Sequence, residues 1–225
     1  MIRYLLFDID DTLLNFRDQS EAVIQDTLAE FGLHFSDEQF AVYHRINNDL
    51  WNQVSNGTLS REGLYAIRWT RVLEALNLPG DGPAVEAQFR RLLNLSAVPE
   101  QGAAETLQAL ASRYTLCTAS NAPQRQQELR LEKADLSRYF AHIFTSEGLG
   151  VDKPSPLFFE RILEALGNPA RDTVMMLGDS PQADVLGAAA VGLRTCFVNL
   201  RGVTLPPDCT PDHTVTTLPD LRKFL

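Results

Sequence analysis

Carboxylates gather where an apolar run ends in the segment YLLFDIDDTL, residues 4–13. Asp8 and Asp10 follow this run directly, and like charges so close together are costly unless a cation or a shared proton offsets them. A hard divalent ion is the simplest remedy, because Mg²⁺ typically takes one or two carboxylates together with water and substrate phosphate. A second acidic site is then expected at another strand end, and the segment VMMLGDSPQAD, residues 174–184, supplies Asp179 and Asp184.

The pair Asp8 and Asp10 also suits phosphoryl transfer. A carboxylate can attack phosphorus and form an aspartyl phosphate, which divides one difficult displacement into two easier ones. A second carboxylate two residues on can protonate the leaving oxygen and later take a proton from the hydrolytic water. We therefore assign Asp8 as the candidate nucleophile and Asp10 as the candidate acid/base, with Mg²⁺ neutralising charge on nucleophile and phosphate.

A phosphoryl group also needs hydrogen-bond donors and positive charge. Ser120 and Asn121 end an apolar segment, LCTASNAP at residues 116–123, and a hydroxyl with backbone N–H groups at a helix start suits a phosphate. Lys153 precedes a proline and a new helix in GVDKPSPLFF, residues 150–159, and lysine serves as a compact point charge for phosphate. These three residues are the candidate substrate-binding groups, and Lys153 is also a candidate catalytic residue.

Each of these motifs taken alone has an ordinary structural explanation. An Asp-x-Asp pair can be a helix cap or a solvated loop, a Ser-Asn pair an N-cap, a Gly-Asp-Ser segment a turn, and a single Lys a solvated side chain. The four occur in order, each at the end of a predicted strand, and that combination favours one shared ligand site.

The elements that must position these residues follow from the apolar pattern. Short runs typical of buried strands lie at 4–7, 114–119, 142–145, 174–177 and 195–198, with a weaker one at 213–217. Amphipathic segments of helical length lie between them at about 103–112, 123–135, 156–167 and 181–191. Alternating strands and helices predict an α/β fold, with a Rossmann-like three-layer core in which helices cover both faces of a parallel sheet.

One connection is too long for a simple crossover. About a hundred residues separate the first two strands, where a strand-helix-strand unit needs about thirty. The excess is helical in pattern, with helices expected near 18–31, 36–54, 60–76 and 83–95. We therefore predict a catalytic core at 1–14 and 96–225 and an inserted all-helical domain at 15–95, which covers the site as a lid and hinges near 14–18 and 94–101.

Composition narrows the classes of partner. The 225 residues carry a formal net charge of −9 and are 44% hydrophobic, which argues against a nucleic-acid polymer as partner while leaving room for a small anionic ligand. Three cysteines without pattern fit a reducing compartment, and neither a signal peptide nor a run of transmembrane length is apparent. The expectation is a cytoplasmic protein that does not bind membranes.

Taken as a set, the motifs resemble those of the haloacid dehalogenase superfamily of phosphohydrolases. The first, D-x-D-x-T, matches Asp8, Asp10 and Thr12; the second matches Ser120, and the third matches Lys153. The fourth, G-D-x-x-x-x-D, matches residues 178, 179 and 184. The likeness covers nearly the whole chain and identifies the helical insert with the cap domain of that family.

The resemblance also implies roles for single residues. Asp8 would be the nucleophile and Asp10 the acid/base, and Mg²⁺ would be held by the Asp8 carboxylate, the Asp10 backbone carbonyl and Asp179. Thr12 and Asp184 would support these groups without binding the metal themselves. Dehalogenases of the superfamily attack carbon without metal and typically lack an acid at the position of Asp10, so phosphate is favoured over halide. The insert has no Lys, which counts against a phosphonate-cleaving relative.

The insert itself is similar to the cap of bacterial pyrimidine 5′-nucleotidases. The shared features are Asn47, Leu50-Trp51, Gly57, Ser60, Leu64, Arg68 and Trp69. That family commonly has Gly after the Asn of its second motif, where this chain has Ala122, so substrate placement departs from the pattern. Trp51 and Trp69 are expected to pack, and Arg68 to be solvated or paired on the surface. The helix face carrying Arg125, Arg130 and Lys133 is expected to be solvated.

These observations predict a Mg²⁺-dependent phosphomonoesterase that uses an aspartyl phosphate and acts on pyrimidine nucleoside 5′-monophosphates. The alternatives are a sugar-phosphate phosphatase or phosphosugar mutase, then a 2-haloacid dehalogenase or a binding protein without turnover. The expected partner is a small phosphorylated metabolite, and the expected assembly is a monomer or homodimer.

Overall fold

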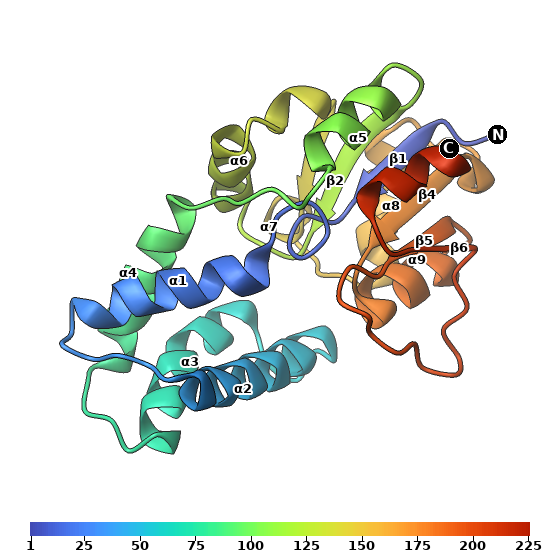
Figure 1. Ribbon diagram of the computed structural model, residues 1–225. Coiled ribbons are helices and arrows are strands. Elements are labelled where there is room, and N and C mark those ends of the chain that lie inside the picture. Colours follow the sequence, from blue (N-terminus) through green and yellow to red (C-terminus); the bar gives the residue numbers. More distant parts are fainter. The chain divides into compact units, whose positions relative to one another are not determined.

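The computed structural model describes residues 1–225, apart from the side chain of Ser55. The chain divides into two compact units: residues 1–16 with 97–225 form one, and residues 17–96 form the other (Figure 1). Each unit is described by itself below.

A parallel sheet organises the first unit. Its strands, in the spatial order β3-β2-β1-β4-β5-β6, are β1 (Tyr4–Phe7), β2 (Thr115–Ser120), β3 (His142–Thr145), β4 (Val174–Gly178), β5 (Arg194–Val198) and β6 (His213–Val215). All neighbours pair in parallel; Leu6 of the central strand, for example, is opposite Cys117 on one side and Met176 on the other. The predicted α/β class is confirmed, and β1 lies between β2 and β4, whose ends carry the other predicted motifs.

Side chains alternate between the two faces of this sheet, because successive residues of a strand point in opposite directions. Leu5 and Phe7 pack on one face with α5 (Ala103–Ala111), α6 (Gln124–Lys133) and the 3₁₀ segment η4 (Leu218–Lys223). Leu6 packs on the other face with α8 (Pro156–Ala165) and α9 (Gly187–Ala190). Both faces are therefore covered, which is why the strands read as continuous apolar runs.

Four short segments complete the first unit. These are η1 (Ser137–Tyr139), α7 (Ser146–Leu149), η2 (Arg171–Thr173) and η3 (Pro181–Leu186). The helical segment expected at about 181–191 is present, but its first part, η3, is a π-helical turn, and α9 follows it directly. The N–H groups of Asp184 and Val185 both donate to the carbonyl of Ser180, which widens this turn, and such turns are frequent at functional sites.

The second unit contains the helical segments α1 (Phe16–Ala29), α2 (Asp37–Ser55), α3 (Arg61–Ala75) and α4 (Gly82–Asn94); Phe16, the first residue of α1, belongs to the first unit. Hydrogen bonds to side chains cap the N-termini of α2, α3 and α4. Gln39 accepts from the Ser36 N–H, Ser60 accepts from the Gly63 N–H, and Asp81 accepts from the Ala84 N–H. Trp69 is fully buried among Tyr43, Phe35 and Phe89, so the expectation that it packs is confirmed.

The prediction that Arg68 is solvated or paired on the surface is wrong. Its side chain is 4% exposed rather than solvated, and it donates from Nε and Nη2 to the two carboxylate oxygens of Glu86, at 3.0 and 2.7 Å. Its Nη1 donates to Asn47 Oδ1 at 3.0 Å. Arg68 follows buried Leu64 by one helical turn, so both lie on the inner face of α3, where a charge needs a partner.

Candidate active site

The loop after β1 presents Asp8 and Asp10 at the carboxyl end of the sheet. The Asp8 N–H continues the ladder by donating to the Leu177 carbonyl of β4. The chain then turns back on itself: Leu13 and Leu14 both donate to the carbonyl of Ile9, and Asp11 takes a left-handed conformation with φ of 57°. Aspartate tolerates this conformation better than most residues, so the local sequence suits the turn.

Lys153 connects two of the predicted carboxylates. Its Nζ lies 2.7 Å from Asp8 Oδ1 and 2.6 Å from Asp184 Oδ1, and its side chain is 3% exposed. Burial alone would lower the pKa of this amine, but the charges of Asp184 and Asp8 outweigh burial and raise the pKa above its ordinary value. The lysine is therefore held charged inside the site.

Asn121 fixes the backbone of Lys153. Its Oδ1 accepts from the Lys153 N–H at 2.8 Å, and its Nδ2 donates to the Lys153 carbonyl at 2.9 Å. The amide of Asn121 is thus committed to the loop that carries the lysine, which departs from the phosphate contact expected of it. The end of β2 and the loop before α8 are joined by this pair of hydrogen bonds.

Asp184 reaches the site because Gly178 leaves room for it. A Cβ added to Gly178 would lie 2.1 Å from Asp184 Oδ2, well inside contact distance. The same Oδ2 accepts from the Ser180 N–H at 3.0 Å, which leaves Oδ1 for Lys153. The Gly-Asp-Ser segment is therefore more than a turn, since it orients the carboxylate that holds the lysine.

Asp8, Asp179 and Asp184 form a cluster with the chemistry of a divalent-cation site. One carboxylate oxygen of each lies within 4.8 Å of the others. Burial raises the pKa of Asp8 to about 7, against the opposing effect of Lys153 and with a smaller contribution from the Asp184 charge. Burial, followed by the charges of Asp8 and Asp184, raises the pKa of Asp179 well above its ordinary range.

Such a group of like charges, with Asp8 and Asp184 buried and Asp179 half-buried, is short of positive charge even with Lys153 present. A hard cation with oxygen ligands would offset both the burial and the mutual repulsion that raise these pKa values, so the residues fit Mg²⁺. The predicted ligands Asp8 and Asp179 are both in the cluster. Asp184 is equally close, although its oxygens also serve Lys153 and Ser180.

Asp10 is held by α6, which the sequence did not indicate. Arg130 donates from Nη1 to Asp10 Oδ1 at 2.5 Å, and Gln127 donates from Nε2 to Asp10 Oδ2 at 2.8 Å. Gln127 Nε2 also donates to Ser120 Oγ at 2.9 Å, at the last position of β2. Asp10 and Ser120 are thereby brought together through one side chain.

The expectation that Arg130 is solvated is therefore wrong, whereas Arg125 and Lys133 on the same helix are exposed. Arg130 is 0% exposed. The helix QRQQELRLEK has so few apolar residues that its inner face cannot be recognised from hydrophobicity. The available signal is positional: Gln127, Arg130 and buried Leu131 are spaced three and four residues apart, as one face of a helix requires.

Thr12 is also buried, at 0% exposed, and its Oγ1 has no hydrogen-bond partner among the described residues. Its supporting role stays a prediction.

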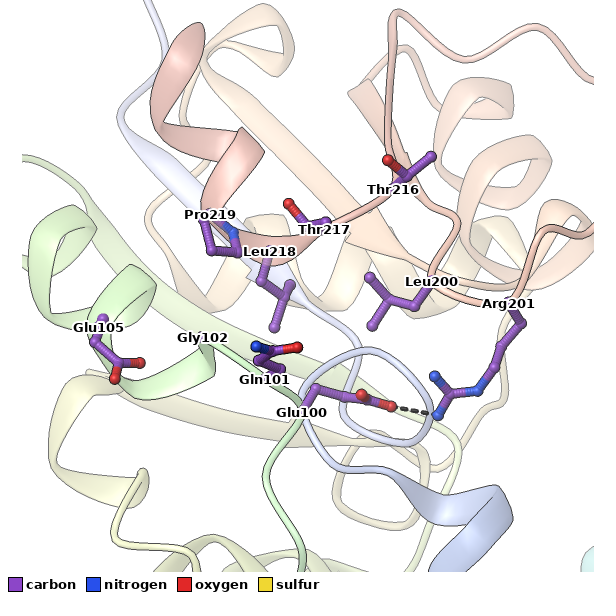
Figure 2. Close-up of a pocket in the computed structure, with 10 residues that line it drawn as sticks. All are labelled: Glu100, Gln101, Gly102, Glu105, Leu200, Arg201, Thr216, Thr217, Leu218 and Pro219. Carbon is purple, nitrogen blue, oxygen red and sulfur yellow. Dashed lines mark hydrogen bonds and ion pairs between the residues drawn. The ribbon is translucent and has the colours of Figure 1, made fainter.

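A separate pocket lies in the same unit, beside the loop that carries the acids. It has a volume of 540 Å³ and is lined by Glu100, Gln101, Gly102, Glu105, Leu200, Arg201, Thr216, Thr217, Leu218 and Pro219 (Figure 2). Arg201 at its edge pairs with Glu100, and its guanidinium also lies 3.4 Å from Asp11 Oδ1. The described lining does not include the predicted site residues, so the pocket is distinct from the acidic cluster.

Comparison with known proteins now decides the family. The family model described as a haloacid dehalogenase-like hydrolase matches residues 2–192. The chain belongs to the haloacid dehalogenase-like hydrolases. The suspected superfamily is thus confirmed, and the chain is a hydrolase of that family. Among the described residues, no helix has the length and apolarity needed to cross a bilayer.

Individual members of the haloacid dehalogenase-like family resemble the whole chain. Pyrimidine 5′-nucleotidase YjjG of Escherichia coli is 32% identical over 99% of this chain and 97% of its own length. Pyrimidine 5′-nucleotidase PynA of Streptococcus pneumoniae is 28% identical over 99% and 94%. The crystal structure of the putative HAD-hydrolase YfnB from Bacillus subtilis, bound to magnesium, matches with a TM-score of 0.94 at 27% identity, covering 100% of this chain and 98% of that one.

Proposed function

We propose that this hydrolase is a Mg²⁺-dependent phosphomonoesterase that forms an aspartyl phosphate on Asp8 and acts on nucleoside 5′-monophosphates, pyrimidine nucleotides in particular. The observation that carries the proposal is the meeting of Lys153 with Asp8 and Asp184, beside Asp179, at the carboxyl end of a parallel sheet. A nucleophilic carboxylate, a fixed cation and a divalent-ion site together suit attack on a phosphate ester.

The first step transfers the phosphoryl group to Asp8. A carboxylate oxygen of Asp8 forms a bond to phosphorus while the bond from phosphorus to the ester oxygen breaks, and that oxygen keeps the electron pair. Asp10 gives its proton to the departing oxygen, so the alcohol leaves neutral. The products of this step are the free nucleoside and phosphorylated Asp8.

The second step releases phosphate. Water attacks phosphorus, Asp10 takes the proton that the water loses, and the bond between phosphorus and the Asp8 oxygen breaks. Inorganic phosphate leaves, and Asp8 and protonated Asp10 are restored for the next cycle. Asp10 thus acts first as an acid and then as a base.

The remaining site residues hold the phosphoryl group. Lys153 supplies a fixed positive charge, and the Ser120 hydroxyl supplies a hydrogen-bond donor. Asn121 acts through Lys153, whose backbone it holds on both sides. These donors stabilise the charge that spreads over the phosphoryl oxygens in the transition state.

Mg²⁺ would be held by the Asp8 carboxylate, the Asp10 backbone carbonyl and Asp179, with Asp184 close by. When bound, it would neutralise charge on the nucleophile and on the phosphate. The magnesium bound to YfnB supports Mg²⁺ as the ion, and the assignment of its ligands rests on the acidic cluster. The pKa of Asp8, raised to about 7 by burial, supports it independently, since the cation would favour the ionised form.

The choice of substrate rests on the relatives. YjjG and PynA are both named pyrimidine 5′-nucleotidases and match over nearly their full lengths. The cap features shared with such enzymes support the same choice, although Asn47, Arg68 and Trp69 are buried and therefore shape the helical unit rather than contact a base. The lid role and the hinges predicted for that unit stay predictions, as does the monomeric or dimeric state.

A substrate panel tests the proposal. UMP, dTMP, hexose phosphates, an aryl phosphate and 2-chloropropionate are compared with Mg²⁺ and with EDTA. The proposal predicts the highest kcat/KM with a pyrimidine nucleotide, loss of turnover in EDTA and its return with Mg²⁺. Preference for hexose phosphates would instead indicate a sugar-phosphate phosphatase, and metal-independent release of chloride would indicate a dehalogenase.

A further inference from the structure

We infer that Gln127 and Arg130 are positioning residues that set the direction of the hydrogen bonds at Asp10 and Ser120. This inference rests on the proposed function, because it assigns Asp10 and Ser120 the roles given above. It adds the helix α6 to the loops that carry the family motifs.

The contacts form one connected path. Arg130 Nη1 donates both to Asp10 Oδ1 and, at 3.1 Å, to Gln127 Oε1. Gln127 Nε2 donates to Asp10 Oδ2 at 2.8 Å and to Ser120 Oγ at 2.9 Å. Gln127 is 0% exposed and Ser120 2% exposed, so water competes little for the bond between them, whereas the Asp10 side chain is 29% exposed.

The donor and acceptor roles along this path follow from chemistry. A guanidinium only donates, so the atom of Gln127 that faces Arg130 must be the carbonyl oxygen. The amide nitrogen of Gln127 must then face Asp10 and Ser120, and it donates one of its two protons to each of them. Arg130 therefore decides which way the amide of Gln127 points.

This direction has a consequence for Ser120. Its oxygen accepts from Gln127, so the hydroxyl proton is left to donate elsewhere. A donor is what a phosphoryl oxygen needs, and the path therefore prepares Ser120 to bind phosphate. With an acceptor in place of the Gln127 amide nitrogen, the hydroxyl proton would be drawn away from the substrate.

It has a second consequence for Asp10. Each of its carboxylate oxygens accepts one hydrogen bond from α6, which fixes the rotation of the carboxyl group. Each oxygen still has another lone pair for the proton that the mechanism moves. The acid/base is thus held in one orientation without being blocked, and small errors of orientation in catalysis are costly.

Stability does not explain Arg130. Its guanidinium is fully buried, its Nε and Nη2 have no hydrogen-bond partner among the described residues, and the ring of Phe16 lies 5.5 Å from its Cζ. Burying a charge with unsatisfied donors costs free energy that one ion pair recovers only in part. The feature that sets Arg130 apart from an apolar side chain of similar size is its directed contact with Gln127 and Asp10.

The test compares Arg130→Met, Arg130→Lys, Gln127→Leu and Gln127→Glu with the control Arg125→Met, which removes an exposed arginine from the same helix. Two substrates are used with Mg²⁺: UMP, whose alcohol leaves poorly without a proton, and p-nitrophenyl phosphate, whose phenol leaves without help. General-acid catalysis is worth about 10²–10⁴-fold. We expect Arg130→Met and Gln127→Leu to lower kcat for UMP by about 10-fold or more and for p-nitrophenyl phosphate by about 3-fold or less.

Inorganic phosphate, used as a competitive inhibitor, reports on Ser120 separately. Gln127→Glu turns the donor into an acceptor, so we expect its inhibition constant for phosphate to rise by about 10-fold, while Gln127→Leu changes it by about 2-fold or less. Arg130→Lys keeps a donor and is expected to recover part of the UMP activity. Thermal unfolding checks that each variant is folded, and the glutamine variants provide the test if an arginine variant is not.

The outcomes separate this inference from the proposed function. If the unmodified enzyme hydrolyses no phosphate ester, or if Asp8→Asn retains full activity, the proposed function fails. Suppose that the enzyme passes those tests, but the Arg130 and Gln127 variants have the same kcat values as Arg125→Met. Or suppose that they lose kcat equally for both substrates, with an unchanged inhibition constant for phosphate. Either result overturns the positioning role and leaves the proposed function standing.

Discussion

Lys153 and Asp8 are 145 positions apart in the chain, yet 2.7 Å separates the Lys153 amine from Asp8 Oδ1. Asp8 follows β1 directly, whereas Lys153 lies in the loop between α7 and α8, where Asn121 holds its backbone. Asp184 binds the same amine from the other side. One lysine therefore balances two carboxylates in a part of the fold that water hardly reaches.

Lys153→Met should damage stability and activity together. It leaves Asp8 and Asp184 buried without their cation, and removing one partner of a buried ion pair costs about 3–5 kcal/mol. We expect denaturant unfolding to show a loss of that order in the metal-free protein, and kcat/KM to fall by about 10³-fold or more. Lys133→Met, on an exposed position, is the control. Equal stability of the two variants would show that Lys153 does not neutralise the cluster.

The effect of Mg²⁺ on stability should depend on pH. Because burial raises the pKa of Asp8 from 3.8 to about 7, the folded, metal-free protein binds more protons than the unfolded chain between about pH 4 and 7. The stability that Asp8 contributes to the metal-free protein is therefore fully present below that window and is lost as the pH rises through it. Mg²⁺ competes with those protons, so its stabilising effect should grow as pH rises.

Thermal unfolding with and without Mg²⁺, over a series of pH values from about 5 to 8.5, measures this dependence. We expect a Tm increase that is small at the acidic end and largest above pH 7. In Asp179→Asn the increase should be reduced at every pH. An increase that is the same at all pH values, or that survives unchanged in Asp179→Asn, would contradict the assigned metal site.

Arg68 and Glu86 should matter for folding rather than for substrate choice. Glu86→Ala leaves the Arg68 guanidinium buried without its carboxylate, and we expect a loss of about 3 kcal/mol or more in the free energy of unfolding. Replacing both by Met and Leu should restore much of that loss. The ratio of kcat/KM for UMP to that for a hexose phosphate should stay the same in the double variant. A changed ratio would show that Arg68 contributes to substrate selectivity.

The cysteines should be unreactive in the folded protein. Burial raises the pKa of Cys117 and Cys196 from 9.0 to about 12 and also raises that of Cys209, so the nucleophilic thiolate is scarce at neutral pH. A thiol reagent at about pH 8 should react slowly with the native protein and with all three cysteines after unfolding. Rapid labelling of a native cysteine would contradict this. Since the folded pKa values lie above the unfolded ones, the thiols should lower stability as pH rises from about 9 to 12.

The sequence could predict the fold and the acidic site for a physical reason. Strands buried on both faces of a parallel sheet must be apolar throughout, so β1, β2 and β4 can be recognised as apolar runs in the sequence. Parallel strands end at one edge, so Asp8, Lys153 and Asp179 could be expected to meet once each was assigned to a strand end. Their contacts depend on topology more than on the details of packing.

The residues that the sequence did not reveal depend on packing. Arg130 and Gln127 lie on a helix of polar composition, whose inner face becomes visible only when the strand beneath it is known. Arg68 is long and charged, and residues of that kind are usually exposed unless they are paired. Its partner Glu86 is 18 positions away, so the pair could not be recognised before the two helices were placed.

The π-helical turn at residues 181–186 is another such case. An amphipathic pattern predicted an ordinary helix, but the turn widens where Asp184 points back to Lys153 and Ser180. Local sequence favours a helix there, and the demands of the site change its form. The same demand explains why Gly178 lacks a side chain that would occupy the space of Asp184.

The most direct measurement traps the phosphoryl group during turnover. UMP labelled in its phosphate is mixed with the enzyme and Mg²⁺, the reaction is quenched in acid within milliseconds, and the labelled peptide is identified. We predict label on the peptide that contains Asp8, removed by hydroxylamine as an acyl phosphate is, and absent from Asp8→Asn. Label on another residue, or full turnover by Asp8→Asn, would contradict the account.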